Sequence, residues 1–356
     1  MSTLIASNLQ ASGSTGTAAL LASINGGPIS GARNRIINGD MRIDQRNGGA
    51  AVTPTNGSYT LDRWSGNVTQ ASKFTVQQNA GAVTPPAGFT NYLGVVSSSA
   101  YSVTSSDAFS VYQAIEGLNS ADLAWGTADA QPVVLSFWVR SSLTGTFGGS
   151  LKNTAGNRSY PFSYTISSAN TWERKSVVVS GDTSGTWLSN NGVGILLAFG
   201  LGVGTTFSGT AGAWAGANLI SATGATSVVG TSGATFYITG VQLEAGTVAT
   251  PFERRSYGQE LALCQRYFST VRSTVRVYNA AASAIAAAGH AYFATVMRST
   301  PTVTMTDSVS ERVNVDVSYP QASNISAQGF TVTTVSTGGI REFYDNDRLW
   351  QASAEL

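Results

Sequence analysis

The chain has 356 residues, of which 42% are hydrophobic and only 11% are charged, with a net charge of +1. Soluble domains usually carry about 25% charged residues, so we expect serine, threonine and asparagine to supply most of the polar surface. The near-zero net charge excludes the basic footprint of proteins that bind nucleic acids or anionic membranes. Glycine (39 residues) and aromatic residues (10%) are abundant, which is typical of β structure and not of a disordered chain.

Two residue types that often carry chemistry occur once each, as Cys264 and His290. A single cysteine excludes a disulfide within the chain and a cysteine-based zinc site. His290 follows a glycine at the start of a strand-like segment and has no Gly-x-Ser-x-Gly partner, so we predict a surface position and no catalysis. The sequence also has no run of 18 apolar residues and no leader of signal-peptide type. We therefore expect no membrane insertion, no secretion, no cofactor and no metal site.

Residues 1–32 contain scattered aliphatic side chains and no charged one; the first charge is Arg33. This segment is too small to build its own core and too apolar for a solvated tail. It is either a disordered leader or an arm that becomes ordered against partner subunits. We take it as an N-terminal attachment arm.

From residue 33 to residue 250 the pattern is that of β-strands. Residues 73–78, 162–167 and 173–180 alternate apolar and polar side chains, whereas residues 133–141 (VVLSFWVRS) are almost continuously apolar. Turn signals such as Asn56-Gly57 separate these runs. Many short strands with frequent turns predict an antiparallel β-sandwich of jelly-roll type. A parallel β-helix is disfavoured because no rung-length repeat is present.

Residues 251–270 form a charged junction in which we predict one short amphipathic helix. Ser256 and Gln259 have the spacing of a capping box. Leu261, Cys264 and Phe268 fall on one helical face, which we expect to pack on the sandwich or on a symmetry mate. The polar residues expected to set the angle between the domains are Arg254, Arg255 and Glu260.

Residues 271–356 return to alternating β patterns and predict a second, smaller β domain. In this domain, one strand face is expected to carry Val313, Val315, Val317 and Tyr319, and Asp345-Asn346-Asp347 is expected to form a turn.

Aromatic side chains are the residues best suited to bind a neutral sugar, because a ring packs on the C–H face of the sugar. Trp64 and Trp138 lie in apolar contexts and are expected in the core. The candidates for exposed stacking lie near loops or in the last domain: Trp125, Trp187, Trp214, Tyr319, Tyr344 and Trp350.

Pairs of acidic residues also occur, but we assign them structural roles. Glu244 and Glu253 are expected to pair with Arg254 and Arg255, not to act as the two carboxylates of a glycosidase. Asp345-Asn346-Asp347 lacks the later ligands of a calcium loop. Gly200, Gly202 and Gly204 lack the spacing of a phosphate-binding loop, so we expect them at close strand contacts.

Several stretches resemble proteins of tailed bacteriophages. VQLEAGTVATPFERRSYGQELALCQRYF (241–268) is similar to a junction segment found in tail fibre and related virion proteins. Shorter similarities follow the same order and cover residues 34–46, 59–64, 137–151, 172–187, 297–304 and 350–356. The resemblance implies a virion structural protein with a jelly roll like that of a carbohydrate-binding module, assembled as a homotrimer. It brings no catalytic residues and leaves the position on the particle open.

These observations favour a non-enzymatic tail fibre subunit that is made in the bacterial cytoplasm and incorporated into the virion. Its partners would be copies of itself, other virion proteins through residues 1–32 and a glycan of the host surface. Weak sugar contacts repeated over many copies would give avidity. The alternatives are a head fibre, decoration or tail-adaptor protein without a receptor role, and a capsule-degrading enzyme.

Overall fold

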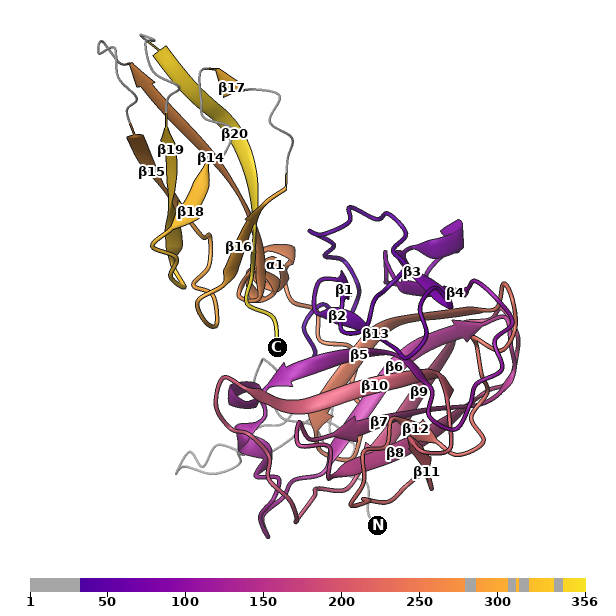
Figure 1. Ribbon diagram of the computed structural model, residues 1–356. Helices are drawn as coiled ribbons and strands as arrows, with labels where there is room; N and C mark the ends of the chain where they lie inside the picture. Colours follow the sequence, from indigo (N-terminus) through magenta and orange to yellow (C-terminus); the bar gives the residue numbers. More distant parts are fainter. Residues whose placement is uncertain (1–32, 279–285, 307–311, 314–319, 336–341) are drawn as a thin grey trace, which may run out of the picture.

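The computed structural model describes residues 33–278, 286–306, 312–313, 320–335 and 342–356. The expected arm (1–32) and the residues Val315, Val317 and Tyr319 lie outside this part of the chain. The described residues build a large antiparallel β-sandwich, one short helix and a smaller pair of β-sheets (Figure 1). Within them, no helix has the length and apolar character needed to cross a membrane.

The large sandwich consists of two sheets, and the chain passes between them repeatedly, as in a jelly roll. The six-stranded sheet has the order β1 (Tyr59–Leu61), β2 (Trp64–Val68), β5 (Ala108–Glu116), β10 (Val193–Val203), β7 (Gly145–Lys152) and β8 (Ser159–Ile166). The five-stranded sheet has the order β3 (Phe74–Gln78), β4 (Leu93–Ser97), β13 (Thr235–Ala245), β6 (Val133–Ser141) and β9 (Glu173–Val179). Neighbouring strands in both sheets are antiparallel. The expected antiparallel sandwich is confirmed.

Short elements complete this domain. They are the 3-10 turns η1 (Ala80–Ala82), η2 (Gly117–Asn119) and η3 (Ala121–Leu123), and the parallel pair β11 (Ser208–Gly209) and β12 (Ser221–Ala222).

Alternation along the strands decides which side chains enter the core of the large sandwich. In β5, Phe109 and Val111 point inward, while the strand's intervening residues Ser110 and Tyr112 lie on the outer face. Trp64 is fully buried, as expected, and its indole N–H donates to the Asn38 carbonyl at 3.1 Å. Trp138 is different, because it falls between the inward-pointing Phe137 and Val139 and is therefore half-buried on the outer face. The expectation that Trp138 is a core residue was wrong.

Helix α1 (Tyr257–Gln265) begins with the predicted capping box: the Ser256 hydroxyl accepts from the Gln259 backbone, and the Gln259 side chain accepts from the Ser256 backbone. Cys264 is buried on the helix face that meets the large sandwich, with Leu261 half-buried beside it. The expectation that Phe268 lies on the helix face with Leu261 and Cys264 was wrong. Phe268 is the first residue of strand β14, because the helix ends three residues earlier.

The smaller domain is a second sandwich. One sheet holds β14 (Phe268–Tyr278), β20 (Glu342–Ser353), β16 (Thr302–Met305) and β17 (Arg312–Val313), and the other holds β15 (Ala286–Tyr292), β19 (Gly329–Val335) and β18 (Gln321–Ser323). Asp345-Asn346-Asp347 does not form the expected turn but lies within β20. Its register against β14 shifts by one residue at this point, so the turn-forming residues occupy a β-bulge inside a long strand.

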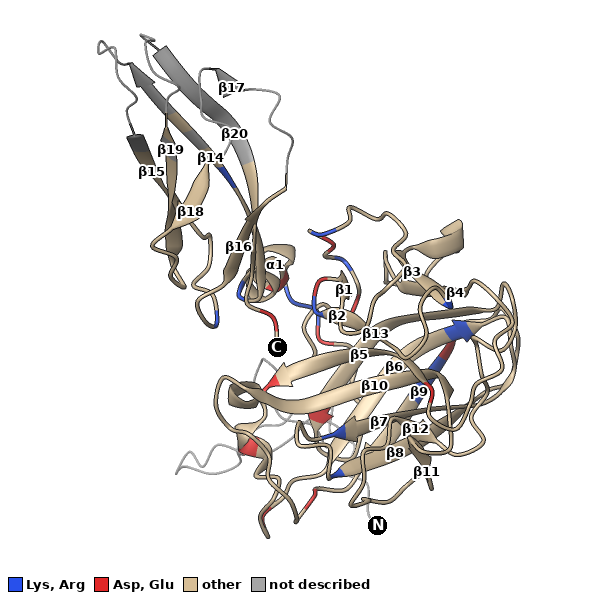
Figure 2. Cartoon of the chain, in the orientation of Figure 1, with Lys and Arg blue, Asp and Glu red and all other residues tan. Residues whose placement is uncertain are grey.

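Charged residues gather where the two sandwiches meet (Figure 2). The buried guanidinium of Arg63 pairs with Glu355, donates to the Ala114 carbonyl at 2.5 Å and lies 3.6 Å from the centre of the Tyr267 ring. Arg46 binds the same Glu355 carboxylate at 2.5 Å. Two arginines from the start of the large sandwich therefore meet at the carboxylate of Glu355, and Tyr267, just after α1, packs against one of them.

Further polar contacts involve the residues predicted for the junction. Glu260 is buried, accepts from the Asn38 backbone N–H at 2.5 Å and pairs with Arg255 at 3.3 Å. Arg255 also pairs with Glu253 at 3.6 Å. Arg254 makes no such link and instead lies 4.7 Å from the centre of the Phe89 ring.

We predict that Glu355→Ala lowers the free energy of unfolding by about 3–5 kcal/mol, because it leaves the buried Arg63 charge without its partner. Asp122→Ala is the matched control. Asp122 pairs with Arg35 at 2.7 Å, but its side chain is 66% exposed, so the loss there should stay below about 1 kcal/mol. Urea denaturation of both variants measures the difference, and equal losses would contradict a buried ion pair at the domain junction.

Candidate functional site

The structure brings three of the predicted sugar-binding tryptophans together. Trp125 lies 4.7 Å from Trp187 and 5.3 Å from Trp214, and Trp187 lies 5.5 Å from Trp214, all edge to face between ring centres. Each indole N–H donates to a backbone carbonyl at 2.8–3.2 Å. Trp125 is buried, so the expectation of an exposed ring was wrong for it; Trp187 and Trp214 are half-buried against the core. The trio packs against the core of the sandwich.

The three candidates of the smaller domain are not gathered into a site. Tyr319 lies outside the described residues, and the side chain of Tyr344 is also outside them, although its backbone is part of β20. Trp350 is only 3% exposed, packs on Phe330 at 5.3 Å and donates its N–H to the Ser273 hydroxyl at 2.7 Å. Trp350 is therefore a core residue, and its assignment as an exposed stacking ring was wrong.

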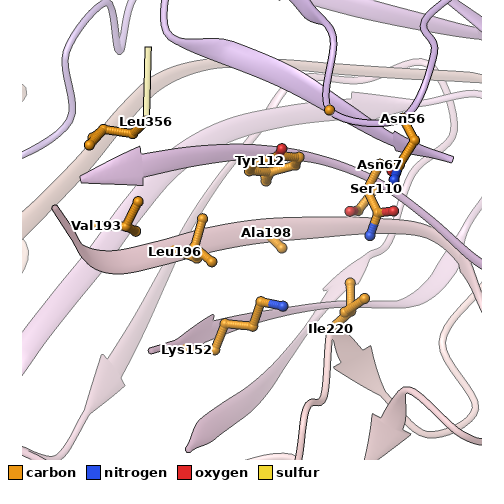
Figure 3. Close-up of a pocket in the computed structure, with 11 residues that line it drawn as sticks. Asn56, Asn67, Ser110, Tyr112, Lys152, Val193, Leu196, Ala198, Ile220 and Leu356 are labelled. Atoms are coloured by element: carbon orange, nitrogen blue, oxygen red, sulfur yellow. The ribbon is translucent and has the colours of Figure 1, made fainter. Parts of the chain in front are cut away.

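A groove lies instead on the outer face of the six-stranded sheet (Figure 3). We call it the tyrosine groove. It has a volume of about 300 Å³. Its lining consists of Asn56, Gly57, Asn67, Ser110, Tyr112, Lys152, Val193, Leu196, Ala198, Ile220 and Leu356.

The strand register explains how these residues meet. Ser65, Tyr112, Ala198 and Ser150 lie opposite one another on β2, β5, β10 and β7. The next row toward Lys152 is formed by Ala114, Leu196 and Lys152. Side chains directly opposite each other in antiparallel strands share one face. Small residues beside Tyr112 therefore leave a hollow over the sheet, with the phenol ring at one side and Lys152 across β10 (Figure 3).

Segments outside the sheet form the walls of the tyrosine groove. Strand β12 crosses the outer face so closely that a Cβ on Gly200 would lie 2.8 Å from the Ser221 hydroxyl oxygen. Glycine at 200 thus allows the close strand contact predicted for this run, and it places Ile220 at the groove's edge. On other sides the wall is the Asn56-Gly57 turn and Leu356, whose carbonyl accepts from the Tyr59 hydroxyl at 3.1 Å.

The polar groups of the tyrosine groove are only partly satisfied. Lys152 donates to the Asn218 side-chain oxygen at 2.8 Å and has no carboxylate partner among the described residues. Burial lowers the pKa of its ammonium group. The Asn67 amide and the Tyr112 hydroxyl have no hydrogen-bond partner within the described part of the chain. The groove therefore offers a ring, an amide, a hydroxyl and a cation to a polar ligand.

Tyr112 was not among the predicted sugar-binding residues, because those candidates lie near loops or in the last domain. The signal was present in AFSVYQAIE (108–116), where the apolar alternation places Tyr112 on the face opposite Phe109 and Val111. The small partners of Tyr112 on neighbouring strands could not be found this way, because the strand order depends on contacts between residues far apart in the sequence.

Other chemically capable side chains have structural partners. Glu244 is buried and accepts from the Thr250 hydroxyl at 2.7 Å and the Gln242 amide at 2.9 Å, so its expected pairing with arginine was wrong. His290 is exposed on β15, with Nδ1 3.3 Å from the Thr331 hydroxyl. No group of three or more His, Cys, Asp or Glu residues that could hold a metal ion occurs within the described ranges.

Comparison with known proteins gives only distant similarities. No protein-family model and no curated protein sequence matches the chain. Similar solved structures include the enzymatically active domain of tailspike protein 4 of bacteriophage CBA120, at 15% identity and a TM-score of 0.33 over 60% of this chain and 21% of that one. A putative sugar binding protein from Bacteroides thetaiotaomicron VPI-5482 has 15% identity and a TM-score of 0.34 over 60% of this chain and 99% of that one.

A family 11 carbohydrate-binding module from Clostridium thermocellum, solved with a β-1,3-1,4-mixed-linked tetrasaccharide, has 12% identity and a TM-score of 0.28 over 56% of this chain and 97% of that one. The chain thus spans about a fifth of the tailspike structure and nearly all of the other two. At these TM-scores the similarity assigns no ligand to this chain.

We predict that Lys152→Met raises the free energy of unfolding at neutral pH. The folded-state pKa of Lys152 lies below its ordinary value of 10.5, so the wild type carries the full cost of the desolvated charge below both pKa values. That cost fades as the pH rises from the folded-state pKa to 10.5, and the advantage of the variant should shrink over the same window. Denaturation curves at several pH values test this, with Lys73→Met as a control outside the groove; an advantage that does not change with pH would contradict the lowered pKa.

Proposed function

We propose that this chain is a non-enzymatic, glycan-binding subunit of a tailed-bacteriophage fibre and that the tyrosine groove holds the sugar. The observation that carries the proposal is the partly exposed Tyr112 ring over a floor of small side chains, with unpaired amide and hydroxyl groups beside it. A sugar presents both apolar C–H faces and hydroxyl groups, so it needs this combination of ring and polar handles.

The groups that line the groove favour binding over cleavage. They are amides, hydroxyls, one phenol and one ammonium, which can donate to and accept from sugar hydroxyls. Hydrolysis of a glycosidic bond uses two carboxyl groups on either side of the sugar. A depolymerase would therefore have to build its site elsewhere on the chain.

The assignment to a phage particle rests on the sequence similarity of residues 241–268 and of the shorter stretches that accompany it. The low charge of the chain, 11% of residues, also suits a subunit covered by copies of itself. A homotrimer anchored through residues 1–32 would present three tyrosine grooves, and repeated weak contacts would give avidity through effective concentration. The virion is the proposed location.

We predict that Tyr112→Ala weakens binding to a glycan selected from a host-surface array by about 10-fold, or about 1.4 kcal/mol, the scale of one aromatic contact. Tyr112→Phe should retain most of the ring contribution and lose only the hydroxyl contact. Tyr292→Ala is the control, because Tyr292 is 74% exposed in the smaller domain, away from the groove. Calorimetric titration measures all three variants; equal affinity of Tyr112→Ala and the wild type would place the glycan elsewhere.

We expect antibodies against the large sandwich to label the tail fibres of purified virions in electron micrographs. Labelling on the capsid would support the head-fibre alternative. Absence of the protein from purified particles would overturn the virion assignment while leaving the glycan measurement unaffected.

A further inference from the structure

A second groove lies on the outer face of the other sheet of the large sandwich, the five-stranded one. We call it the tryptophan groove. Its volume is about 240 Å³. Its lining comes from three strands and two loops and includes Phe89, Trp138, Arg174, Gly240, Phe252 and Arg254. None of them belongs to the tyrosine groove.

The floor of this groove is the outward-pointing Trp138. On the sheet it lies between Arg174 of β9 and Thr239 of β13. The next residue of β13, Gly240, has φ of +61° within a break in the strand register. A Cβ there would lie 2.6 Å from the Phe89 ring and 3.3 Å from the Trp138 ring. Glycine at 240 therefore keeps the space between these two rings open.

The indole N–H of Trp138 sets it apart from the other tryptophans. The chain has seven, and the other six all donate their N–H to an oxygen of the protein. Trp138 has no such partner among the described residues. A half-buried indole with a free donor is suited to a ligand that brings an acceptor oxygen.

Two arginines add positive charge to the same groove. Arg174 and Arg254 are both exposed, and neither forms an ion pair with a described carboxylate. Arg174 uses one nitrogen to donate to the Thr250 carbonyl at 2.9 Å. Arg254 lies over the Phe89 and Phe252 rings, at 4.7 Å and 5.8 Å from their centres. Asp40 interacts electrostatically with Arg254, but it is buried and bound to Arg42 at 2.6 Å.

The loop that carries Pro251, Phe252 and Arg254 is held in place by a buried carboxylate of strand β13. The buried Glu244 carboxylate accepts from the Thr250 backbone N–H at 2.8 Å and from the Thr250 hydroxyl at 2.7 Å. The side of the groove is thereby fixed before any ligand binds, which reduces the entropy cost of binding.

We propose that the tryptophan groove binds an anionic sugar, a uronic acid residue of an acidic polysaccharide. The Trp138 ring packs on the sugar's C–H face, and the indole N–H donates to a ring or hydroxyl oxygen. The two guanidinium groups bind the carboxylate, for which their planar donor pairs are suited. This site is separate from the tyrosine groove and does not depend on that groove binding a glycan.

The test is calorimetric titration of the full-length protein with oligomers of galacturonate, glucuronate and mannuronate, each compared with its neutral methyl ester. At least one acidic oligomer should bind about 10-fold more tightly than its ester, the difference expected for charge-assisted hydrogen bonds. Arg174→Gln and Arg254→Gln should remove this preference, and added salt should weaken only the acidic oligomer. Trp138→Ala should weaken both forms, whereas Trp138→Phe should retain the ring contribution.

Two controls separate this result from other effects. Lys73→Gln removes one positive charge outside the groove and should leave both affinities unchanged. Thermal unfolding confirms that each variant is folded. The proposal is overturned if no oligouronate binds, if acid and ester bind equally, or if the arginine variants keep the preference for the acid.

Discussion

The arrangement of the two sandwiches depends on the buried ion pair between Arg63 and Glu355. A guanidinium group that is shielded from water on nearly all sides is costly unless it is paired and hydrogen-bonded. Here it has a carboxylate, a backbone carbonyl and the face of Tyr267 as neighbours. Arg63 itself has a left-handed backbone with φ of +70°, a strained conformation for a residue with a side chain. The contacts that it makes across the junction offset this strain.

The same constraint gives the end of the chain a structural role. Glu355 follows β20, the central strand of one sheet in the smaller sandwich, and it brings that strand's continuation onto the larger one. Ala354 donates its backbone N–H to the Tyr267 carbonyl at 2.8 Å, next to the point where α1 ends. Both ends of the smaller sandwich are thus tied to the larger sandwich, which resists bending between them more than a single linker would.

Local rules predicted a large part of this fold from the sequence. The alternation of apolar residues indicated the strands, and Ser256 with Gln259 indicated where α1 begins. The sequence did not reveal that Asn346 and Asp347 lie in a β-bulge, because pairing with β14 outweighs their local preference for turns. The same limit applied to the sugar-binding candidates. Trp125 in a loop and Trp350 in β20 are buried by contacts between distant segments, and neither position could be read from its neighbours in the chain.

Strand residues form the floor of both grooves and loop residues form their sides, and this follows from the architecture of a sandwich. Each strand buries one face, so an aromatic residue whose two neighbours along the strand point inward must lie on the outer face. Tyr112 and Trp138 are the two examples, on opposite sheets. Each becomes a site only because neighbouring strands place small residues or glycine beside it. That second condition depends on strand order, which local sequence does not specify.

The junction also completes both grooves. Leu356, next to the residue that pairs with Arg63, forms part of the wall of the tyrosine groove. The segment from Pro251 to Arg254, which leads into α1, forms one side of the tryptophan groove. Movement of the smaller sandwich relative to the larger one would therefore displace Leu356 from the tyrosine groove, whereas Glu244 of the larger sandwich holds the loop at the side of the tryptophan groove. The buried ion pair between Arg63 and Glu355 thus supports a wall of the tyrosine groove, and a second buried carboxylate, that of Glu244, supports the side of the tryptophan groove.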